Sequence, residues 1–280
     1  MRIPHLIAAT ACLFVTAAET RAQAPVGPPQ FSYADLVDRT LAAPLALIVT
    51  ITEAIRLPAQ QVASLPPGRA RLYVEATATR LIRGPAGVPP QVRYLVDVPL
   101  DAKGRVPKLK KTAMLLLARP VPGRSGELQL IAPDAQIPLT ADIERRIRAI
   151  LTEVVKADTP PAVTGIASAF HVAGTVEGEG ETQIFLSTRA NQPISLNILR
   201  RPGQERSWSV ALSEVVDEAA QPPNRETFLW YRLACGLPRS LPEDVVAELE
   251  PAAARAARSD YAFVLQQLGA CTRTRPVRTS

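Results

Sequence analysis

Pairs of adjacent prolines interrupt this sequence at several places and limit the helices and strands between them. Proline makes up 27 of the 280 residues, about twice its usual share of about 5%. The pairs include Pro66-Pro67, Pro89-Pro90, Pro160-Pro161 and Pro222-Pro223. Proline fixes φ and lacks a backbone N–H, so each pair is expected in a connection where an element has ended. With 47% hydrophobic residues, the chain otherwise has a globular composition.

Residues 32–135 are predicted to form a β-rich module. Ser32 and Asp35 match a capping box that opens a short helix. Segments rich in β-branched and aliphatic residues follow at residues 45–57, 70–82, 91–98, 112–119 and 127–132. Between the third and fourth segments, Asp101 and Gly104 stand where a type I turn favours them, which predicts a hairpin. Five strands in this space favour a small barrel-like sheet.

Residues 136–159 are predicted to be a connecting amphipathic helix, which Thr140 caps. A second module is expected over residues 160–271. Its strands are predicted at residues 162–176, 182–188, 193–199 and 207–216. The connections between them are short and rich in glycine, asparagine, proline or charge, as an antiparallel meander requires.

The last third of the chain is predicted to be helical. Asn224 caps one helix, Ser240 and Glu243 form a capping box for another, and residues 252–270 form a third. Residues 272–280 are expected to be a disordered basic tail. The predicted fold class is α+β: a small five-strand β-barrel-like module, then an antiparallel sheet packed with C-terminal helices.

Residues 1–24 have the parts of an export signal. Arg2 gives a cationic start, residues 6–18 are apolar, and Ala22 and Ala24 are small residues at the −3 and −1 positions. The apolar run is shorter than the roughly 20 residues that span a bilayer. A mature periplasmic protein without a transmembrane span is therefore expected.

The position of the signal cleavage site stays open. Pro25 would follow a cut after Ala24, and signal peptidases tolerate proline poorly there. Cleavage before Glu19 or before Gln23 is the alternative. Residues 25–31 are expected to be a linker.

Removal of the signal takes away Cys12 and leaves Cys235 and Cys271. Each follows apolar residues at helical spacing, so both thiols are expected on apolar helix faces. An even number of cysteines in an oxidising compartment favours a disulfide. Two buried free thiols are the alternative, and a redox-active pair would want the C-x-x-C spacing that this chain lacks.

His171 is the only histidine left once His5 is removed with the signal. It is therefore the one candidate for imidazole catalysis. The nearby candidate partners are Ser168, Ser187, Ser195, Glu177 and Glu181. No G-x-S-x-G motif accompanies them, and a structural or surface histidine on a strand is the alternative to a cofactor-free hydrolase.

No cofactor is expected, since the chain has neither a dinucleotide fingerprint nor a phosphate-binding P-loop. Zinc lacks enough histidine and cysteine ligands. The segment Glu177-Gly-Glu-Gly-Glu181 carries three carboxylates. It is predicted to be a hairpin tip, with a calcium site as the alternative.

Three basic clusters contribute to the net charge of +6. They contain Lys103, Arg105, Lys108, Lys110 and Lys111 on a predicted loop, Arg145, Arg146 and Arg148 on a predicted helix, and Arg200, Arg201 and Arg206 around a turn. The candidate anion-binding residues are Lys108, Lys110, Lys111, Arg200 and Arg201. Basic side chains bind phosphate and carboxylate groups, which predicts an anionic envelope polymer or acidic protein as partner. The alternative is a solvated surface, and nucleic acid is not expected because few aromatic residues are present for stacking.

Four segments carry a resemblance to a known group of proteins. They are residues 168–176, 181–186, 199–203 and 229–235. In these motifs the chain resembles an uncharacterised exported protein family of sphingomonad-type alphaproteobacteria, with no assigned activity, and the similarity extends over about residues 32–242. The resemblance implies a Gram-negative periplasm and supplies no catalytic residue.

Together these patterns predict a non-enzymatic periplasmic protein with a binding or envelope-associated role. The first alternative is a cofactor-free hydrolase that uses His171. The second is an interaction module for an acidic or anionic envelope partner.

Overall fold

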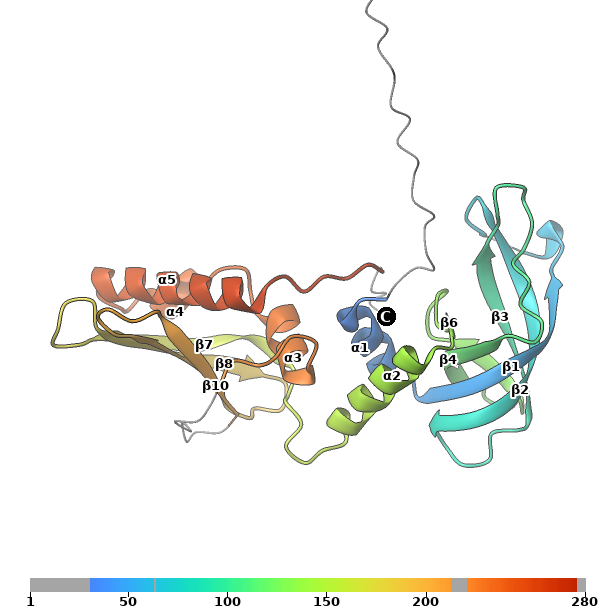
Figure 1. Cartoon of the computed structure of the whole chain (residues 1–280), viewed down its shortest axis with the longest axis horizontal. Helices are drawn as coiled ribbons and strands as arrows, with labels where there is room; N and C mark the ends of the chain where they lie inside the picture. The colour runs from blue at the N-terminus through green and yellow to red at the C-terminus, as the bar shows by residue number, and fades with distance from the viewer. Residues whose placement is uncertain (1–30, 63, 213–220, 276–280) are drawn as a thin grey trace, which may run out of the picture. The chain divides into compact units, whose positions relative to one another are not determined.

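The computed structural model describes residues 31–62, 64–212 and 221–275, which all belong to one compact unit, Phe31–Ser280 (Figure 1). The expected export signal, nearly all of the linker and the end of the strand predicted at residues 207–216 lie outside the described residues. No helix in these described ranges is long and apolar enough to cross a membrane.

Helix α1 (Tyr33–Ala42) begins with the capping box that the sequence predicts. Ser32 Oγ accepts from the Asp35 N–H, and the Asp35 carboxylate accepts from the Ser32 N–H, both at 3.1 Å. The box satisfies N–H groups that have no partner within the helix.

Six strands follow and form a closed, barrel-like sheet. They are β1 (Leu45–Arg56), β2 (Arg69–Arg83), β3 (Gln91–Pro99), β4 (Ala113–Pro120), β5 (Glu127–Leu130) and β6 (Gln136–Pro138), with a short 3-10 helix η1 (Ala59–Gln61) between β1 and β2. The order is β1-β2-β3-β5-β4-β6, and pairing of β1 with β4 closes the barrel. The pair β3–β5 is parallel and the others are antiparallel. This is the order of an OB-type Greek-key barrel; the five-strand barrel-like module is confirmed, and β6 was not predicted.

Alternation along the strands separates two apolar clusters. The inward residues of β3 are Val92, Tyr94, Val96 and Val98. In β4, Met114 and Leu116 lie in this barrel core, whereas Leu115 and Leu117 belong to a second cluster that includes residues of α1. Strand β4 therefore contributes buried side chains to both apolar clusters.

The hairpin predicted between β3 and β4 is wrong. The turn itself forms, since the Gly104 N–H donates to the Asp101 carbonyl at 2.9 Å. However, β3 pairs with β2 and β5, while β4 pairs with β1. Turn chemistry specifies a local reversal of the chain and not which strand becomes the neighbour. We call residues 100–112, which connect these two strands, the basic loop.

Helix α2 (Ala141–Val154) follows the barrel and begins as predicted. Thr140 Oγ accepts from the Ile143 N–H at 3.1 Å. Ile147 and Ile150 are fully buried in the cluster that also holds α1 residues.

The second sheet is the predicted antiparallel meander. Its strands are β7 (Val163–Ala173), β8 (Gly180–Thr188), β9 (Ile194–Arg200) and β10 (Ser207–Ala211), in the order β10-β9-β8-β7. Helices α3 (Phe228–Gly236), α4 (Glu243–Val246) and α5 (Pro251–Leu268) follow. Helix α5 runs along one face of this sheet (Figure 1), so the α+β class is confirmed.

Two helix starts differ from the prediction. Helix α3 is capped by Thr227, whose Oγ accepts from the N–H three residues on at 3.2 Å. Asn224 does not cap it because Glu226 has a φ of 58°, which prevents a helix from starting earlier. The capping box at Ser240 is also absent: Pro242 takes the cap position of the single-turn α4 without a side-chain hydrogen bond.

The chain end differs as well. Helix α5 ends at Leu268, and its C-cap residue Gly269 has a φ of 70°, so Cys271 lies beyond the helix rather than on its apolar face. We expected fraying from residue 272, but Thr274 and Arg275 hydrogen-bond to Asp35. Residues 276–280 lie outside the described part of the chain.

Candidate functional site

The basic loop is anchored to the end of the barrel by apolar side chains. Leu109 is only 8% exposed and belongs to the barrel core, and Leu100 and Val106 pack against the same core. Lys108 and Lys110, on either side of Leu109, are exposed. Burial of Leu109 therefore holds these two lysines at the surface.

Backbone hydrogen bonds fix the end of the loop. Lys111 has a φ of 67°, in the left-handed region that residues other than glycine seldom adopt. The Lys111 N–H donates to the Ile51 carbonyl at 2.7 Å, and the Ile51 N–H donates to the Thr112 carbonyl at 3.0 Å. These bonds to β1 hold a conformation that costs about 1 kcal/mol or more.

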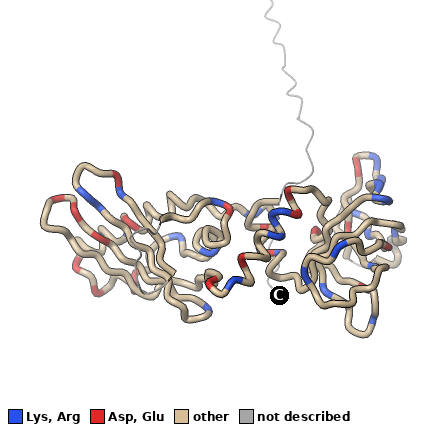
Figure 2. The backbone as a smooth tube through the Cα atoms, turned by 60° about the horizontal axis from the view of Figure 1, so that its bottom comes forward, with Lys and Arg blue, Asp and Glu red and all other residues tan. Residues whose placement is uncertain are grey.

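Within the described part of the chain, the charges of the loop lysines are not compensated by ion-pair partners. Lys103, Lys108, Lys110 and Lys111 are exposed, and none has an ion-pair partner within residues 31–62, 64–212 and 221–275. Arg105 differs, because it pairs with Asp101 at 2.7 Å. Figure 2 shows the charged positions along the described backbone. Among the described residues, the loop therefore presents four lysines without ion-pair partners, three of them close to the anchored Leu109 and Lys111.

Most arginines of the other two basic clusters have ion-pair partners. On α2 the pairs are Arg145 with Asp142, Arg146 with Glu226, and Arg148 with Glu144. Arg200 and Arg206 both reach Asp260, at 2.7 and 3.3 Å. Arg201 is exposed at its turn. Of the predicted anion-binding residues, Lys108, Lys110 and Lys111 thus come together, whereas Arg200 belongs to a different, buried network.

His171 lies in that buried network on the face of β7 that α5 covers. Its Nδ1 is 2.8 Å from Thr182 Oγ1, which donates to Asp260 Oδ2 at 2.5 Å. Because the hydroxyl proton goes to Asp260, the Thr182 oxygen accepts from His171, and the imidazole proton is on Nδ1. Burial lowers the pKa of His171; Asp260 opposes this shift and Arg200 adds to it.

The geometry around His171 does not assemble a nucleophile. The Thr182 side chain is fully buried and its proton is committed to Asp260. The three candidate serines, Ser168, Ser187 and Ser195, alternate with inward residues of their strands and lie on the opposite face of the sheet. Glu181 accepts from Gln183 rather than orienting the imidazole. The carboxylate behind His171 is that of Asp260, from another element.

Sequence reasoning missed Thr182 and Asp260. They are 78 positions apart, and only the packing of α5 on β8 brings them together. One signal was present: Asp260 stands three and four positions from Ala257 and Val264, within the apolar stripe of α5. An acidic residue in such a stripe is rarely buried unless it is paired.

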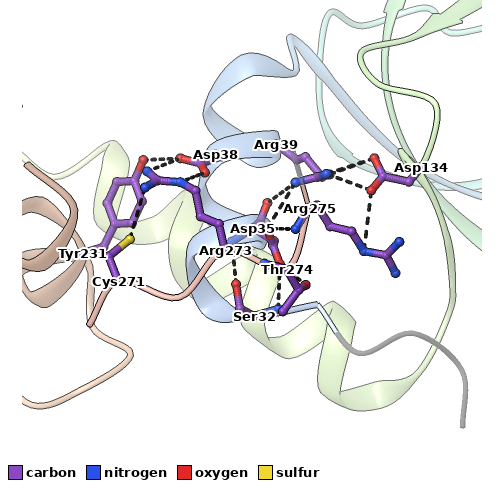
Figure 3. Close-up of polar contacts among 10 residues, drawn as sticks. All are labelled: Ser32, Asp35, Asp38, Arg39, Asp134, Tyr231, Cys271, Arg273, Thr274 and Arg275. Carbon is purple, nitrogen blue, oxygen red and sulfur yellow. Dashed lines mark hydrogen bonds and ion pairs between the residues drawn. The ribbon is translucent and has the colours of Figure 1, made fainter. Parts of the chain in front are cut away.

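A second polar network ties the C-terminal residues to α1 (Figure 3). The N–H groups of Thr274 and Arg275 donate to the two Asp35 oxygens at 3.1 Å each. Arg273 Nε donates to Asp38 Oδ2 at 2.7 Å, and Tyr231 also donates to Asp38. We call residues 271–275 the C-terminal strap.

The strap begins at the predicted cysteine pair. Cys235 and Cys271 form a disulfide-capable pair, with the sulfurs 2.09 Å apart; that the bond forms in the exported protein stays a prediction. Burial raises the pKa of Asp35, but hydrogen bonds from Thr274 and Ser32 outweigh it and lower the pKa below the usual value. Burial and the bond to Asp38 raise the pKa of Tyr231 to about 12, so its hydroxyl stays a donor. This network bonds residues 273–275 to α1.

The described part of the chain contains no cluster of His, Cys, Asp or Glu that would hold a metal ion. No family model matches the sequence, and no curated protein matches it. The function is therefore argued from the arrangement of side chains, among which the basic loop is the strongest candidate.

Proposed function

We propose that this is an exported, non-enzymatic protein that binds an anionic partner of the cell envelope through the basic loop. The observation that carries the proposal is the set of four exposed lysines without ion-pair partners among the described residues. Phosphate and carboxylate groups are the natural partners of such a cluster.

Bracing of the loop supports the proposal energetically. A loop that is already ordered loses less conformational entropy when it binds. Leu109 and the backbone bonds of Lys111 order the loop backbone near Lys108, Lys110 and Lys111 before any partner binds. Exposed charges of this kind act over about one Debye length, roughly 8 Å at physiological salt. Binding is therefore expected to weaken steeply as salt increases.

A hydrolase is the less favoured function. His171 has an oriented imidazole, but the hydroxyl beside it is buried and bonded to Asp260. A base whose neighbouring hydroxyl is buried and already bonded does not meet the geometric requirements of hydrolysis.

The binding proposal is tested with vesicles of phosphatidylethanolamine that contain phosphatidylglycerol, against vesicles of phosphatidylcholine alone. We expect the mature chain to sediment with the anionic vesicles only, and to be released by salt. The variant Lys108→Gln, Lys110→Gln, Lys111→Asn removes three charges, and asparagine tolerates the left-handed backbone of Lys111. It should bind at least about tenfold more weakly.

The matched control is Arg145→Gln with Arg148→Gln, which removes paired charges from α2. Binding by the loop variant equal to that of wild type would refute the basic loop as the site. Export is tested separately by fractionation and N-terminal sequencing of the mature chain, whose first residue is expected to be Glu19, Gln23 or Pro25.

A further inference from the structure

Strand β7 forms one edge of the four-stranded sheet, since β8 is its only partner among the described strands. Its register with β8 shifts twice before Ser168 and is regular from Ser168 to Ala173. No described residue outside β8 hydrogen-bonds to the backbone of residues 168–173. Alternate residues of this segment therefore direct N–H and C=O groups outward without partners from the described chain.

This edge lacks the features that usually prevent an edge strand from pairing. Proteins protect such edges with lysine, with proline or with charges that point inward. The segment Ser168-Ala-Phe-His-Val-Ala173 contains no proline and no Asp, Glu, Lys or Arg. The two register shifts lie before it and confine regular pairing to these residues. The segment is therefore suited to receive another strand.

Exposed apolar side chains accompany the open edge. Phe170 is 54% exposed and Val172 is 69% exposed. Both lie on the face opposite His171 and α5, because side chains alternate along a strand. The Phe170 ring meets that of Phe185 edge-on, with 6.1 Å between the centroids, so it is held on this face. A strand added to the edge would place new neighbours beside both exposed side chains.

The C-terminal end of β7 is acidic. Glu177 and Glu179, in the turn that leads to β8, are exposed, and neither has an ion-pair partner within the described ranges. Glu181, near the start of β8, is exposed as well. The negative charge at this end is therefore not compensated by described residues.

The N-terminal end of β7 is basic. The Arg189 N–H donates to the Ala162 carbonyl at 2.9 Å, and Arg232 Nε donates to the Pro160 carbonyl at 3.0 Å. Neither arginine has an ion-pair partner in the described part of the chain. Burial lowers the pKa of Arg232; Tyr231 opposes this shift and the charge of Arg189 adds to it. The two guanidinium groups are thus close enough to repel each other and have no carboxylate between them.

We propose that two copies of this chain pair through β7 and join their four-stranded sheets into one continuous sheet. A two-fold axis perpendicular to the sheet makes the two strands antiparallel and keeps each residue on its own face. In the register centred on His171, Phe170 lies opposite Val172 of the second copy, so each exposed apolar residue gains an apolar neighbour. Strand β7 lies outside the basic loop, and the inference does not rest on the proposed function.

Charge complementarity identifies the occupant of the edge as a second copy. Antiparallel pairing brings the acidic end of each β7 to the basic end of the other. In the same register, Glu177 and Glu179 lie alongside residues 163–165 of the second copy, close to its Arg189 and Arg232. Opposite charges therefore meet at both ends of the shared strand pair, and such complementarity selects one partner and one orientation.

The test is sedimentation velocity of the full mature chain, without vesicles, over about 1–500 µM. The regular segment is short, so a weak dimer with a dissociation constant of roughly 10 µM is expected. Amide hydrogen exchange within residues 168–173 should slow as the concentration rises, because outward N–H groups become bonded. A monomer throughout this range overturns the proposal. Because no vesicle is present, this result and the test of the basic loop fail separately.

Phe170→Lys with Val172→Lys should raise the dissociation constant at least about tenfold. Both positions are exposed, and lysines would then face one another across the strand pair. Val155→Lys is the matched control, since Val155 is 81% exposed at the C-terminal end of α2, and it should dimerise like wild type. Equal dimerisation by the double variant and the control overturns β7 as the contact.

Charge reversal tests the antiparallel arrangement and decides alone if the double lysine variant fails to fold. Glu177→Lys with Glu179→Lys should weaken the dimer about threefold to tenfold, because like charges then meet at both ends. Addition of Arg189→Glu should restore much of the affinity. All three positions are exposed. No gain in affinity on this addition overturns the arrangement.

Discussion

The N–H of Arg275 donates a hydrogen bond to Oδ1 of Asp35 at 3.1 Å, across 240 positions of sequence. The last described residue of the chain is thereby bonded to its first helix. Asp35 is fully buried, and its oxygens accept from Ser32, Thr274 and Arg275. A single carboxylate thus joins the start and the end of the folded unit.

Asp35→Asn should destabilise the protein by about 2–4 kcal/mol, because an amide NH2 then faces N–H and O–H donors in a buried site. Urea denaturation measures the change. Asp142→Asn is the control: Asp142 is half exposed and pairs on the surface of α2, so a loss below about 0.5 kcal/mol is expected. Equal effects of the two substitutions would show that the strap contributes little to stability.

Stability should fall at acid pH through the same carboxylate. The pKa of Asp35 is lowered in the folded protein from the usual 3.8, so the unfolded chain binds more protons between the two values. The stabilisation by ionised Asp35 is at its full value above the pKa that Asp35 has in the unfolded chain. It is lost as pH falls through the pKa of Asp35 in the folded protein. Denaturation series from pH 6 downward should show a steeper loss in wild type than in Asp35→Asn. Parallel curves would exclude this assignment.

The cysteine pair should be oxidised in the exported protein. It closes a loop with a sequence separation of 36, which by the chain-entropy model contributes about 3–4 kcal/mol. Denaturation without reductant should reveal no reactive thiol. With reductant, the transition should move to lower urea, and the strap should become accessible to proteases. Two titratable thiols in the untreated mature protein would contradict the pairing.

Thr182→Val should uncouple His171 from Asp260. The substitution keeps the shape but removes the hydroxyl that bonds to both residues. We expect a loss of about 1–3 kcal/mol, because Asp260 retains its arginine partners but loses one donor.

The titration of His171 gives a second readout for that network. Its pKa is lowered from the usual 6.5, so the folded protein resists protonation. The contribution of neutral His171 to the free energy of unfolding is therefore at its full value above pH 6.5. It declines as pH falls toward the pKa of His171 in the folded protein. Imidazole resonances followed by NMR should titrate below 6.5 in wild type. A value above 6.5 would mean that charge attraction to Asp260 outweighs burial.

Leu109→Ala tests whether bracing matters for binding. It removes the apolar anchor of the basic loop without changing any charge. A loss of about 2–3 kcal/mol is expected from the missing buried side chain, with faster hydrogen exchange at Lys108 and Lys110. Binding to anionic vesicles should weaken although all four lysines remain. Unchanged binding would show that charge alone is sufficient.

Local patterns predicted the elements well and their neighbours poorly. The caps at Ser32 and Thr140 form as expected, since they depend on residues three positions apart. The turn at Asp101 also forms, but closure of β1 onto β4 depends on burial across the whole barrel. A hairpin was therefore predicted where the strands are not adjacent.

The candidate site shows the same division. The cluster of basic residues around Lys108 is visible in the sequence, and so is the one around Arg200. Only the fold reveals that Arg200 pairs with Asp260, 60 positions away, while Lys108 has no such partner among the described residues. Whether a charged side chain has an ion-pair partner depends on tertiary contacts, and the spacing of residues along the sequence does not predict these contacts.

The burial of both faces of β4 has a consequence for how the protein unfolds. Met114 and Leu116 fill the barrel, and Leu115 and Leu117 fill the neighbouring cluster. Neither cluster can melt and leave the other intact, since both would lose the same strand. The described unit should thus behave as one cooperative block, and excising the barrel as a fragment would expose Leu115 and Leu117 to water and invite aggregation.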